Sequence, residues 1–385
     1  MTLDLTRGTP WKSALRFALP LLLGNLLQQL YNTADTIIVG NYVSDRALSA
    51  VGSCTSLTML FTALALGFSI GAGVLVAQYF GAQKLDEVRR IASTSIVLFL
   101  ALGAGMSVLG VVLTRPLLAG LLQTPEALLE MAVTYFMIYA AGLIFQFGYN
   151  IAAAILRAIG DSKATLYFLF ASSLLNVVLD LLLVAVVKMG VAGAAVATVF
   201  SQLLSCVLSF WYMHKKYEFL RFSPRELRFE PKLARRVLTI GAPMAVQQSV
   251  VSCGFMFMQR LVNSCGEDMV ASFTVGSRIE NYLILPTLSF QSTMATYTGQ
   301  NIGAKQPERV SRGLRQVILL AICITLPLSA VAYFLAPQII ALFAISGQAA
   351  AYCTQHLHLA AWAVLVFAVY FPCNGLLQGA GEGLY

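Results

Sequence analysis

Ten apolar stretches of about 20 residues or more dominate this 385-residue sequence and leave few folds open to it. They cover residues 16–40, 53–76, 91–114, 131–156, 165–187, 191–213, 237–261, 270–297, 316–335 and 352–379. A helix of this length crosses the hydrocarbon core of a bilayer and satisfies its backbone hydrogen bonds within itself. We therefore predict an all-α integral membrane protein with ten transmembrane helices.

The composition agrees with a membrane protein. Charged residues make up 11% of the chain, against about 25% in soluble domains, and the mean hydropathy is +0.77. The seven cysteines show no metal-ligand spacing, so we expect buried thiols and no metal cluster. A net charge of +8 can indicate a nucleic-acid partner, but in a membrane protein the interpretation of the charge depends on where the basic residues lie.

The basic residues cluster in alternate loops. Twenty of the 25 lysines and arginines lie in the N-terminal segment and in residues 84–90, 157–163, 215–236 and 305–315. The positive-inside rule places these segments, and the N-terminus, on the cytoplasmic side of a multi-pass protein in the cell (inner or plasma) membrane. The charge follows from topology, and we expect no nucleic-acid partner.

The chain repeats itself at a nearly constant offset. The paired segments are Pro20 with Pro243, VGS at 51–53 with VGS at 275–277, QYFGA at 78–82 with QNIGA at 300–304, and ILRAIGD at 155–161 with LLQGAGE at 376–382. An offset that holds at four sites predicts two units of the same orientation, each with six helices.

We therefore expect an N-lobe at residues 1–213 with spans one to six, a basic cytoplasmic linker at 214–235, and a C-lobe at 236–385 with spans seven to ten. By this symmetry the C-lobe lacks its last two helices, which points to a truncated product or gene model. A ten-helix protein with an unpaired pair of helices in its N-terminal half is the alternative.

Asp35 is a carboxylate within the first apolar stretch. A charge at the centre of a membrane helix costs about 2.5 to 3.5 kcal/mol on insertion scales, so it usually has a use. Asn25, Gln28, Asn32 and Asp35 recur at three- and four-residue spacing, which places them on one helical face. That face requires protein or water beside it.

Further polar residues lie at the same depth. Asn176 and Asp180 are one turn apart in the fifth stretch, and Thr198 lies in the sixth. At 1.5 Å per residue, Asp35, Asp180 and Thr198 all lie roughly 8 to 12 Å below the outer ends of their helices. One shared site is therefore possible.

Two functions suit the side-chain oxygen atoms of Asp35, Asn176, Asp180 and Thr198. They can hold a sodium ion as hard ligands, or the two carboxylates can share a proton. The sequence does not choose between them. The structural alternative is that each carboxylate is neutralised by a fixed hydrogen bond.

Several motifs resemble those of the multidrug and toxic compound extrusion (MATE) family: PLLLGN at 20–25, QLYNTAD at 29–35, AVG at 50–52, QYFGA at 78–82, LRAIGD at 156–161, RIE at 278–280 and GLLQGAG at 375–381. The resemblance implies two lobes around a central cavity. It also implies alternating access and antiport of amphipathic organic compounds against protons or sodium. In similar transporters, residues matching Asp35, Asn176, Asp180 and Thr198 form an N-lobe cation site.

The resemblance also implies small organic, cationic substrates, a bilayer environment and no cofactor beyond the coupling ion, and we expect a monomer. Our substrate-cavity candidates are Gln28, Tyr31, Asn32, Gln247, Gln248 and Glu280. The tenth stretch carries no acid, so a second cation site in the C-lobe is not expected.

Other intramembrane residues have a structural and a functional interpretation. Arg278 and Glu280 are two residues apart, so each should pair with another helix. His356 and His358 are expected to be hydrogen-bonded interface residues, with a proton relay as the functional alternative. The repeat-related Pro20 and Pro243 are candidate hinges, with static bends as the alternative. The glycines between 67 and 73 are expected to be close-packing surfaces.

Two other functions are known for membrane proteins built of many apolar helices. A lipid or lipid-linked oligosaccharide flippase of a related superfamily branch is the alternative, although it would favour an arginine-rich cavity. A membrane prenyltransferase would need an acidic diphosphate-binding motif, and neither Asp86-Glu87 nor Glu267-Asp268 has that form. We therefore expect a protein that is not an enzyme. No nucleotide-binding motif is apparent, so a gradient must drive transport.

Overall fold

The computed structural model describes residues 3–222, 227–343 and 345–381, and these fold into helices joined by short turns, with no strand among them. The helices are α1 (Pro10–Tyr42), α2 (Asp45–Gly81), α3 (Leu85–Pro116), α4 (Glu126–Ala141), α5 (Leu143–Ala158), α6 (Ser162–Asp180), α7 (Val191–Lys216), α8 (Pro231–Ser264), α9 (Glu267–Gly303), α10 (Pro307–Phe334), α11 (Ala336–Ala341) and α12 (Gly347–Ala380). Short π-helical turns extend α3 and α6 (Leu117–Leu121 and Leu181–Val186), and a 3₁₀ turn (Glu218–Leu220) follows α7.

Local sequence explains many of the helix boundaries. The side chains of Ser44 and Asp161 cap α2 and α6 by accepting hydrogen bonds from the backbone N–H groups of Ala47 and Ala164. Proline occupies the start of α8 and α10, where its missing N–H has no helical partner to lose. Gly381 ends α12 in the left-handed conformation, with a φ of 86°.

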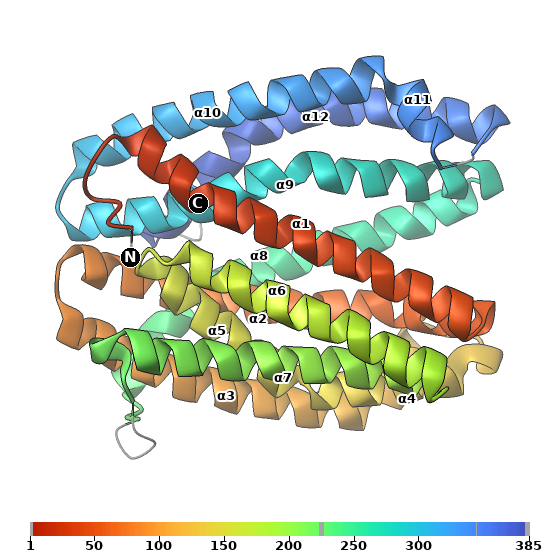
Figure 1. Cartoon of the computed structure of the whole chain (residues 1–385), viewed down its shortest axis with the longest axis horizontal. Helices are drawn as coiled ribbons and strands as arrows, with labels where there is room; N and C mark the ends of the chain where they lie inside the picture. The colour runs from red at the N-terminus through yellow and green to blue at the C-terminus, as the bar shows by residue number, and fades with distance from the viewer. Residues whose placement is uncertain (1–2, 223–226, 344, 382–385) are drawn as a thin grey trace.

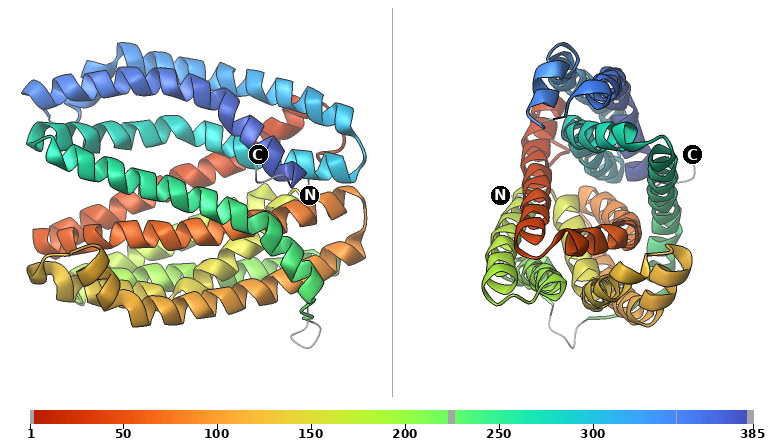
Figure 2. Two further views of the ribbon diagram at one scale, coloured as in Figure 1. Left: turned by 180° about the vertical axis from the view of Figure 1, so that it is seen from behind. Right: turned by 90° about the vertical axis from the view of Figure 1, so that its right-hand side faces the viewer.

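The long helices lie side by side along the long axis of the molecule in two halves (Figure 1). We call α2 to α7 the N half and α9 to α12 the C half. The first described residues and the end of α12 lie at one end of the molecule. The end-on view in Figure 2 shows α1 and α8 running between the halves on opposite sides.

Seven described helices are long and apolar enough to cross a membrane, and the bent pair of α4 and α5 would make eight. The polar helices α1 and α9 are not among them, so composition alone does not confirm ten spans. The predicted fourth span, residues 131–156, falls on two helices, because the chain bends by 45° between α4 and α5, and together the pair is long and apolar enough to be one broken span. Gly142 lies at the bend, where a Cβ would collide with the side chain of Val199 on α7.

The first helix of each sequence repeat crosses to the other half. Phe17 of α1 is fully buried in one core with Phe290, Tyr297 and Val317 of α9 and α10. The later part of α1 packs on α6 instead, and the start of α8 packs on α2 and α3. Residues 1–213 therefore do not pack as a self-contained unit, because the start of α1 belongs to the core of the C half.

The sequence repeat is also a repeat of backbone geometry. Gly160 and Gly381, which the repeat pairs, have φ values of 90° and 86°. Gln83 and Lys305, one residue after the paired QxxGA motifs, have φ values of 58° and 57°. Glu382, the last residue of the fourth paired segment, lies outside the described residues, as do residues 223–226 of the expected linker.

The two halves meet reciprocally through these motifs. The side chain of Gln78 donates to the backbone oxygen of Gly379 at 3.2 Å, and its repeat partner Gln300 donates to that of Ala158 at 2.8 Å. A Cβ on Gly81 would lie 1.9 Å from the backbone oxygen of Gln300. A Cβ on Gly303 would lie 1.8 Å from that of Gln78. These distances show that only glycine permits the contact, which has the self-complementary form of a two-fold interface.

Closer to the middle of the molecule, Gly67 and Gly71 let α2 touch α8. A Cβ on Gly67 would lie 2.2 Å from the Cα of Ala245, and one on Gly71 would lie 2.4 Å from the backbone oxygen of Val237. The prediction that this glycine run is a close-packing surface is confirmed.

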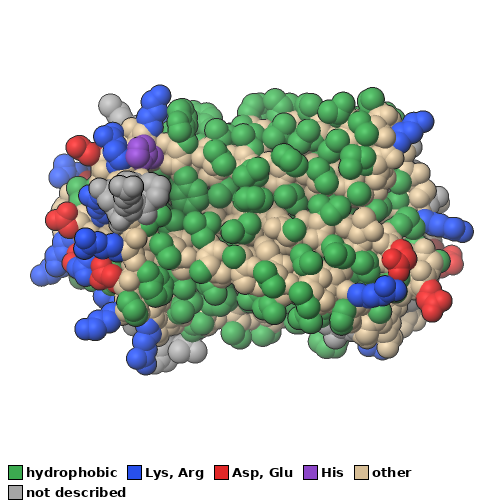
Figure 3. Space-filling model, turned by 90° about the horizontal axis from the view of Figure 1, so that it is seen from below, with side chains coloured by type: hydrophobic (Ala, Val, Ile, Leu, Met, Phe, Trp, Pro, Cys, Tyr) green, Lys and Arg blue, Asp and Glu red, His purple; other side chains and the backbone are tan. Residues whose placement is uncertain are grey.

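On the outer surface drawn in Figure 3, charged side chains lie at the two ends of the molecule. Figure 3 shows one face, on which a broad band of hydrophobic side chains separates the charged ends and lysines and arginines are concentrated at one of them. We call this the basic end. It carries the reciprocal contact and the segment between α7 and α8, which the ion pair of Arg90 with Glu230 (2.6 Å) fastens to α3.

Candidate functional site

Asp35 and Asp180 come together where α1 packs against the N half. Asp35 lies on α1 and Asp180 ends the regular part of α6, just before the π-helical turn. Their carboxyl groups interact electrostatically across the contact of α1 with α6, and Asp180 is fully buried. Two ionised carboxylates have no donor to offer one another, so this contact requires a shared proton or a cation.

The oxygens around this pair have no donor. Asp35 Oδ1, Asn176 Oδ1 and both carboxylate oxygens of Asp180 are buried and accept no hydrogen bond from the described residues. Asn176 lies one helical turn from Asp180, so both project from the same buried face of α6. Buried acceptors are nearly always paired, and a group of unpaired ones indicates a missing proton, water or ion. The donor set fits either a proton or a hard cation.

Thr198 lies beside this cluster. It lines a cavity of about 260 Å³ between α1 and the N half together with Asn176, and we call this space the N-half cavity. Its hydroxyl donates to the backbone oxygen of Ala194 at 3.0 Å, which leaves the lone pairs of its oxygen available. The structure therefore places Asn176 and Thr198 on a cavity wall and Asp35 and Asp180 in contact with each other.

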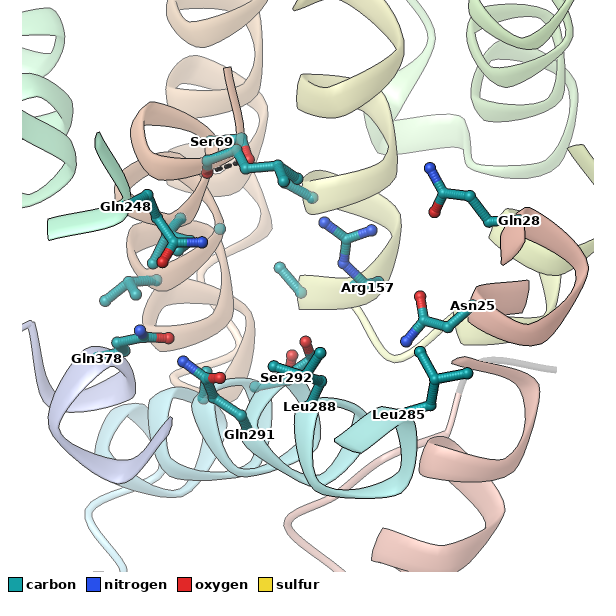
Figure 4. Close-up of a pocket in the computed structure, with 18 of the residues that line it drawn as sticks. Asn25, Gln28, Ser69, Arg157, Gln248, Leu285, Leu288, Gln291, Ser292 and Gln378 are labelled. Atoms are coloured by element: carbon teal, nitrogen blue, oxygen red, sulfur yellow. Dashed lines mark hydrogen bonds between the residues drawn. The ribbon is translucent and has the colours of Figure 1, made fainter. Parts of the chain in front are cut away.

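A larger cavity of about 450 Å³ lies between the halves, walled by α1, α2, α5, α8, α9 and α12 (Figure 4). We call it the central cavity. Asn25, Gln28 and Arg157 line both it and the N-half cavity. Gln29 and Asn32 line both it and a third space of about 260 Å³, the outer cavity. The central cavity therefore adjoins both the N-half cavity and the outer cavity.

Four of the six substrate-cavity candidates line these spaces. Gln28, Asn32 and Gln248 line the central cavity, and Tyr31 lines the N-half cavity. Gln247 and Glu280 are on none of the three walls. Gln247 is displaced because it is adjacent to Gln248 on one helix, where consecutive side chains point about 100° apart.

Glu280 is directed to a neighbouring helix. Its Oε2 lies 3.0 Å from Nε2 of His356 on α12, so the expected pairing with another helix is confirmed. The ring of His358 stacks on that of Tyr333 with 4.2 Å between centroids. Its Nε2 forms a hydrogen bond of 3.1 Å with the backbone oxygen of Tyr333. Both histidines are hydrogen-bonded interface residues, as predicted.

Arg157 is the wall residue that sequence reasoning missed. Its position just after the apolar stretch 131–156 suggested a cytoplasmic loop. Instead α5 continues to Ala158, and the side chain of Arg157 points into the central cavity (Figure 4). The available signal was its place in the repeat motif, where the corresponding residue is Gln378, which lines the same cavity.

Pro20 and Pro243 lie inside α1 and α8, and both helices continue through them. These are the two helices that cross between the halves. A proline removes one backbone hydrogen bond from such a helix. Their role as hinges stays a prediction.

Long apolar helices arranged in two repeat-related halves around a polar cavity are the architecture of a helical membrane transporter. The MatE family model matches residues 20–182 and 243–385 of this chain. The second match begins at Pro243, the residue that the repeat pairs with Pro20.

Two relatives and one solved structure show the same relationship. The chain is 30% identical over 382 residues to the probable multidrug resistance protein YpnP of Bacillus subtilis, covering 99% of this chain and 85% of that protein. It is 25% identical over 383 residues to the probable multidrug resistance protein NorM of Thermotoga maritima, covering 97% of this chain and 81% of that protein. It matches the outward-facing structure of a multidrug resistance MATE family transporter with a TM-score of 0.92, at 26% identity over 99% of this chain and 85% of that one. The chain belongs to the MatE family of multidrug efflux transporters, which are multi-pass membrane proteins.

Proposed function

We propose that the protein is a cation-coupled antiporter that exports small amphipathic organic compounds by alternating access of its two halves. The coupling ion is a proton or sodium, and no other cofactor is needed. The observation that carries this proposal is the contact of Asp35 with Asp180, surrounded by buried oxygens without donors. The protein works as a monomer in the cell membrane, with its N-terminus in the cytoplasm.

The placement of Asp35 supports coupling between ion binding and the relative movement of the two halves. Two carboxylates in contact repel each other when both are ionised, and a bound cation removes that repulsion. Asp35 is on α1, whose earlier part is buried in the core of the C half. A small movement of α1 at the cluster therefore acts on both halves, which is the differential contact that a coupled transition requires.

The contacts at the basic end support alternating access. The reciprocal contact of Gln78 and Gln300 closes this end, which positive-inside reasoning assigns to the cytoplasm. The similar solved structure is described as outward-facing. In the alternate state we expect these contacts to break.

The decisive experiment is efflux from proteoliposomes of defined composition, under an imposed proton gradient or an imposed sodium gradient. We expect Asp35→Asn and Asp180→Asn each to lower gradient-driven efflux at least tenfold, because each removes one of the paired carboxylates. The matched control is Glu130→Gln, which removes an exposed acid on α4 that pairs with Arg115. Normal efflux by both aspartate variants would refute the site. The gradient that drives the wild type identifies the ion.

A further inference from the structure

The charges on the three adjoining cavity walls have one sign. The charged residues that line the central, N-half and outer cavities are Arg157 and Arg278, and no described acid lines any of them. Asp35 and Asp180 face each other beside the N-half cavity, and Glu280 is paired with His356. A substrate in this space therefore meets positive charge.

Arg157 is a half-buried side chain that lacks the partner a charge within a membrane protein normally has. No described residue forms an ion pair or hydrogen bond with its guanidinium, whereas Arg90 and Arg115 each pair with a glutamate. An unpaired guanidinium within a membrane protein is costly and needs a counter-charge. The wall does not supply one, so the occupant must.

The surroundings of Arg157 define the rest of the site. Asn25 and Gln28 of α1 lie on one side of the guanidinium and Gln248 of α8 on the other (Figure 4). These amides can donate hydrogen bonds to an anionic group that the guanidinium holds by paired N–H donors. Apolar side chains of the same wall, Leu285 and Leu288 among them, suit a hydrophobic body. A volume of about 450 Å³ is within the usual range of ligand pockets.

We propose that the central cavity binds an amphipathic organic anion, with its carboxylate, sulfonate or phosphate group on Arg157 and its apolar part against α9. The anion reaches the cavity as a free compound or as the headgroup of an anionic lipid. This assignment rests on the proposed transport function for its physiological meaning, but binding is measurable without any gradient. It replaces the cationic substrate that the family resemblance implies.

The test uses purified full-length protein in nonionic detergent and two probes with the same aromatic body, pyrenebutyrate and pyrenebutylammonium, measured by equilibrium dialysis. We expect the wild type to bind the anion roughly tenfold to a hundredfold more tightly than the cation, the range expected for a charged hydrogen-bonded contact. We expect Arg157→Gln to abolish that preference and Arg157→Lys to retain part of it. The control Arg115→Gln, which removes an exposed arginine outside the cavities, should bind both probes as the wild type does.

Two results would overturn the proposal. One is equal or tighter binding of the cation by the wild type. The other is an equal loss of both probes in Arg157→Gln, which would make Arg157 a structural residue. A third measurement, native mass spectrometry with phosphatidylglycerol or phosphatidylcholine, identifies the source of the anion. Retention of phosphatidylglycerol that requires Arg157 assigns a lipid headgroup, and binding of pyrenebutyrate alone assigns a free compound.

Binding and transport fail separately in this design. If the anion binds through Arg157 but no gradient drives efflux, the antiport proposal is wrong and the binding site stands. If Asp35→Asn and Asp180→Asn stop efflux but the anion shows no preference for the wild type, antiport stands and the anion site is wrong.

Discussion

Asp161 is a buried carboxylate that anchors the junction of α5, α6 and α7 at the basic end. Its side chain is 3% exposed and accepts hydrogen bonds from Tyr212 (2.9 Å), Lys216 (2.8 Å) and Tyr217 (2.5 Å). Burial raises the pKa of Asp161, but these hydrogen bonds outweigh it and hold the pKa below its ordinary value. The ionised form is therefore the one that stabilises the fold.

We expect Asp161→Asn to destabilise the protein by about 2 kcal/mol at pH 7, because it removes a buried charged acceptor from three side-chain donors. A depressed folded-state pKa means that the stabilisation is present above the unfolded pKa of about 3.9 and is lost as pH falls through the folded value. The measurement is thermal unfolding in detergent of wild type and variant from pH 7 to pH 3. The difference in melting temperature should shrink below about pH 4.

The control for this series is Glu130→Gln, which removes an exposed acid, since surface ion pairs contribute about 0 to 1 kcal/mol to stability. A difference between wild type and Asp161→Asn that stays constant from pH 7 to pH 3 would contradict the assigned role of the charge.

At the scale of the helices, the paired motifs QYFGA and QNIGA hold α2 and α9 together. Gly81 and Gly303 bring each backbone against the other half, and Gln78 and Gln300 then bond across it. Alanine at either glycine would place its Cβ less than 2 Å from a backbone oxygen, so the helices must separate. The closed arrangement of the basic end depends on these two residues.

We expect Gly81→Ala and Gly303→Ala each to shift the population toward a state with the basic end open. The measurement is the spin-label distance between the exposed positions Lys84 and Lys305, in a background without the exposed cysteines Cys253, Cys265 and Cys323. Longer distances should appear in both variants. The control is Gly105→Ala, where a Cβ meets no atom within 4 Å. Unchanged distances in both glycine variants would show that the contact is not a gate.

At the scale of the whole molecule, the N-terminal segment ties the halves together. The backbone N–H of Leu3 donates to the oxygen of Gly160 in the N half at 3.1 Å. Leu5 is fully buried and bonds Gln300 and Asn301 of the C half through its backbone, at 3.1 and 3.2 Å. This segment spans the interface at the basic end, where the halves also meet through their repeat motifs.

Deletion of residues 1–6 should weaken this closure and lengthen the distance between labels at Lys84 and Lys305, because the hydrogen bonds of Leu3 to the N half and of Leu5 to the C half are lost. We expect a smaller fraction of molecules in the closed state. A water-soluble labelling reagent added at the basic end should also reach the central cavity faster. Arg7→Gln serves as the control, since its side chain is 87% exposed and the segment remains in place. If the deletion leaves the closed distance unchanged, the segment is not part of the closure.

Much of this architecture was predictable from short-range rules. The apolar stretches located the long helices because the bilayer fixes their length. Hydropathy did not reveal the bend within residues 131–156, which falls at Gly142, where Val199 of α7 leaves no room for a Cβ. Helical rise and alternating loop charges predicted one depth for Asp35 and Asp180, and the structure brings their carboxyl groups together. Periodicity predicted the shared face of Asn176 and Asp180.

The sequence by itself determined the helices, the repeat and the depth of the polar residues, since each follows from spacing along one chain. Only the tertiary structure decided that α1 crosses into the core of the C half, that Gln78 and Gln300 bond reciprocally, and that Arg157 faces a cavity without an acid. These are relations between helices far apart in sequence. They depend on which faces pack together, and helical periodicity leaves that choice open.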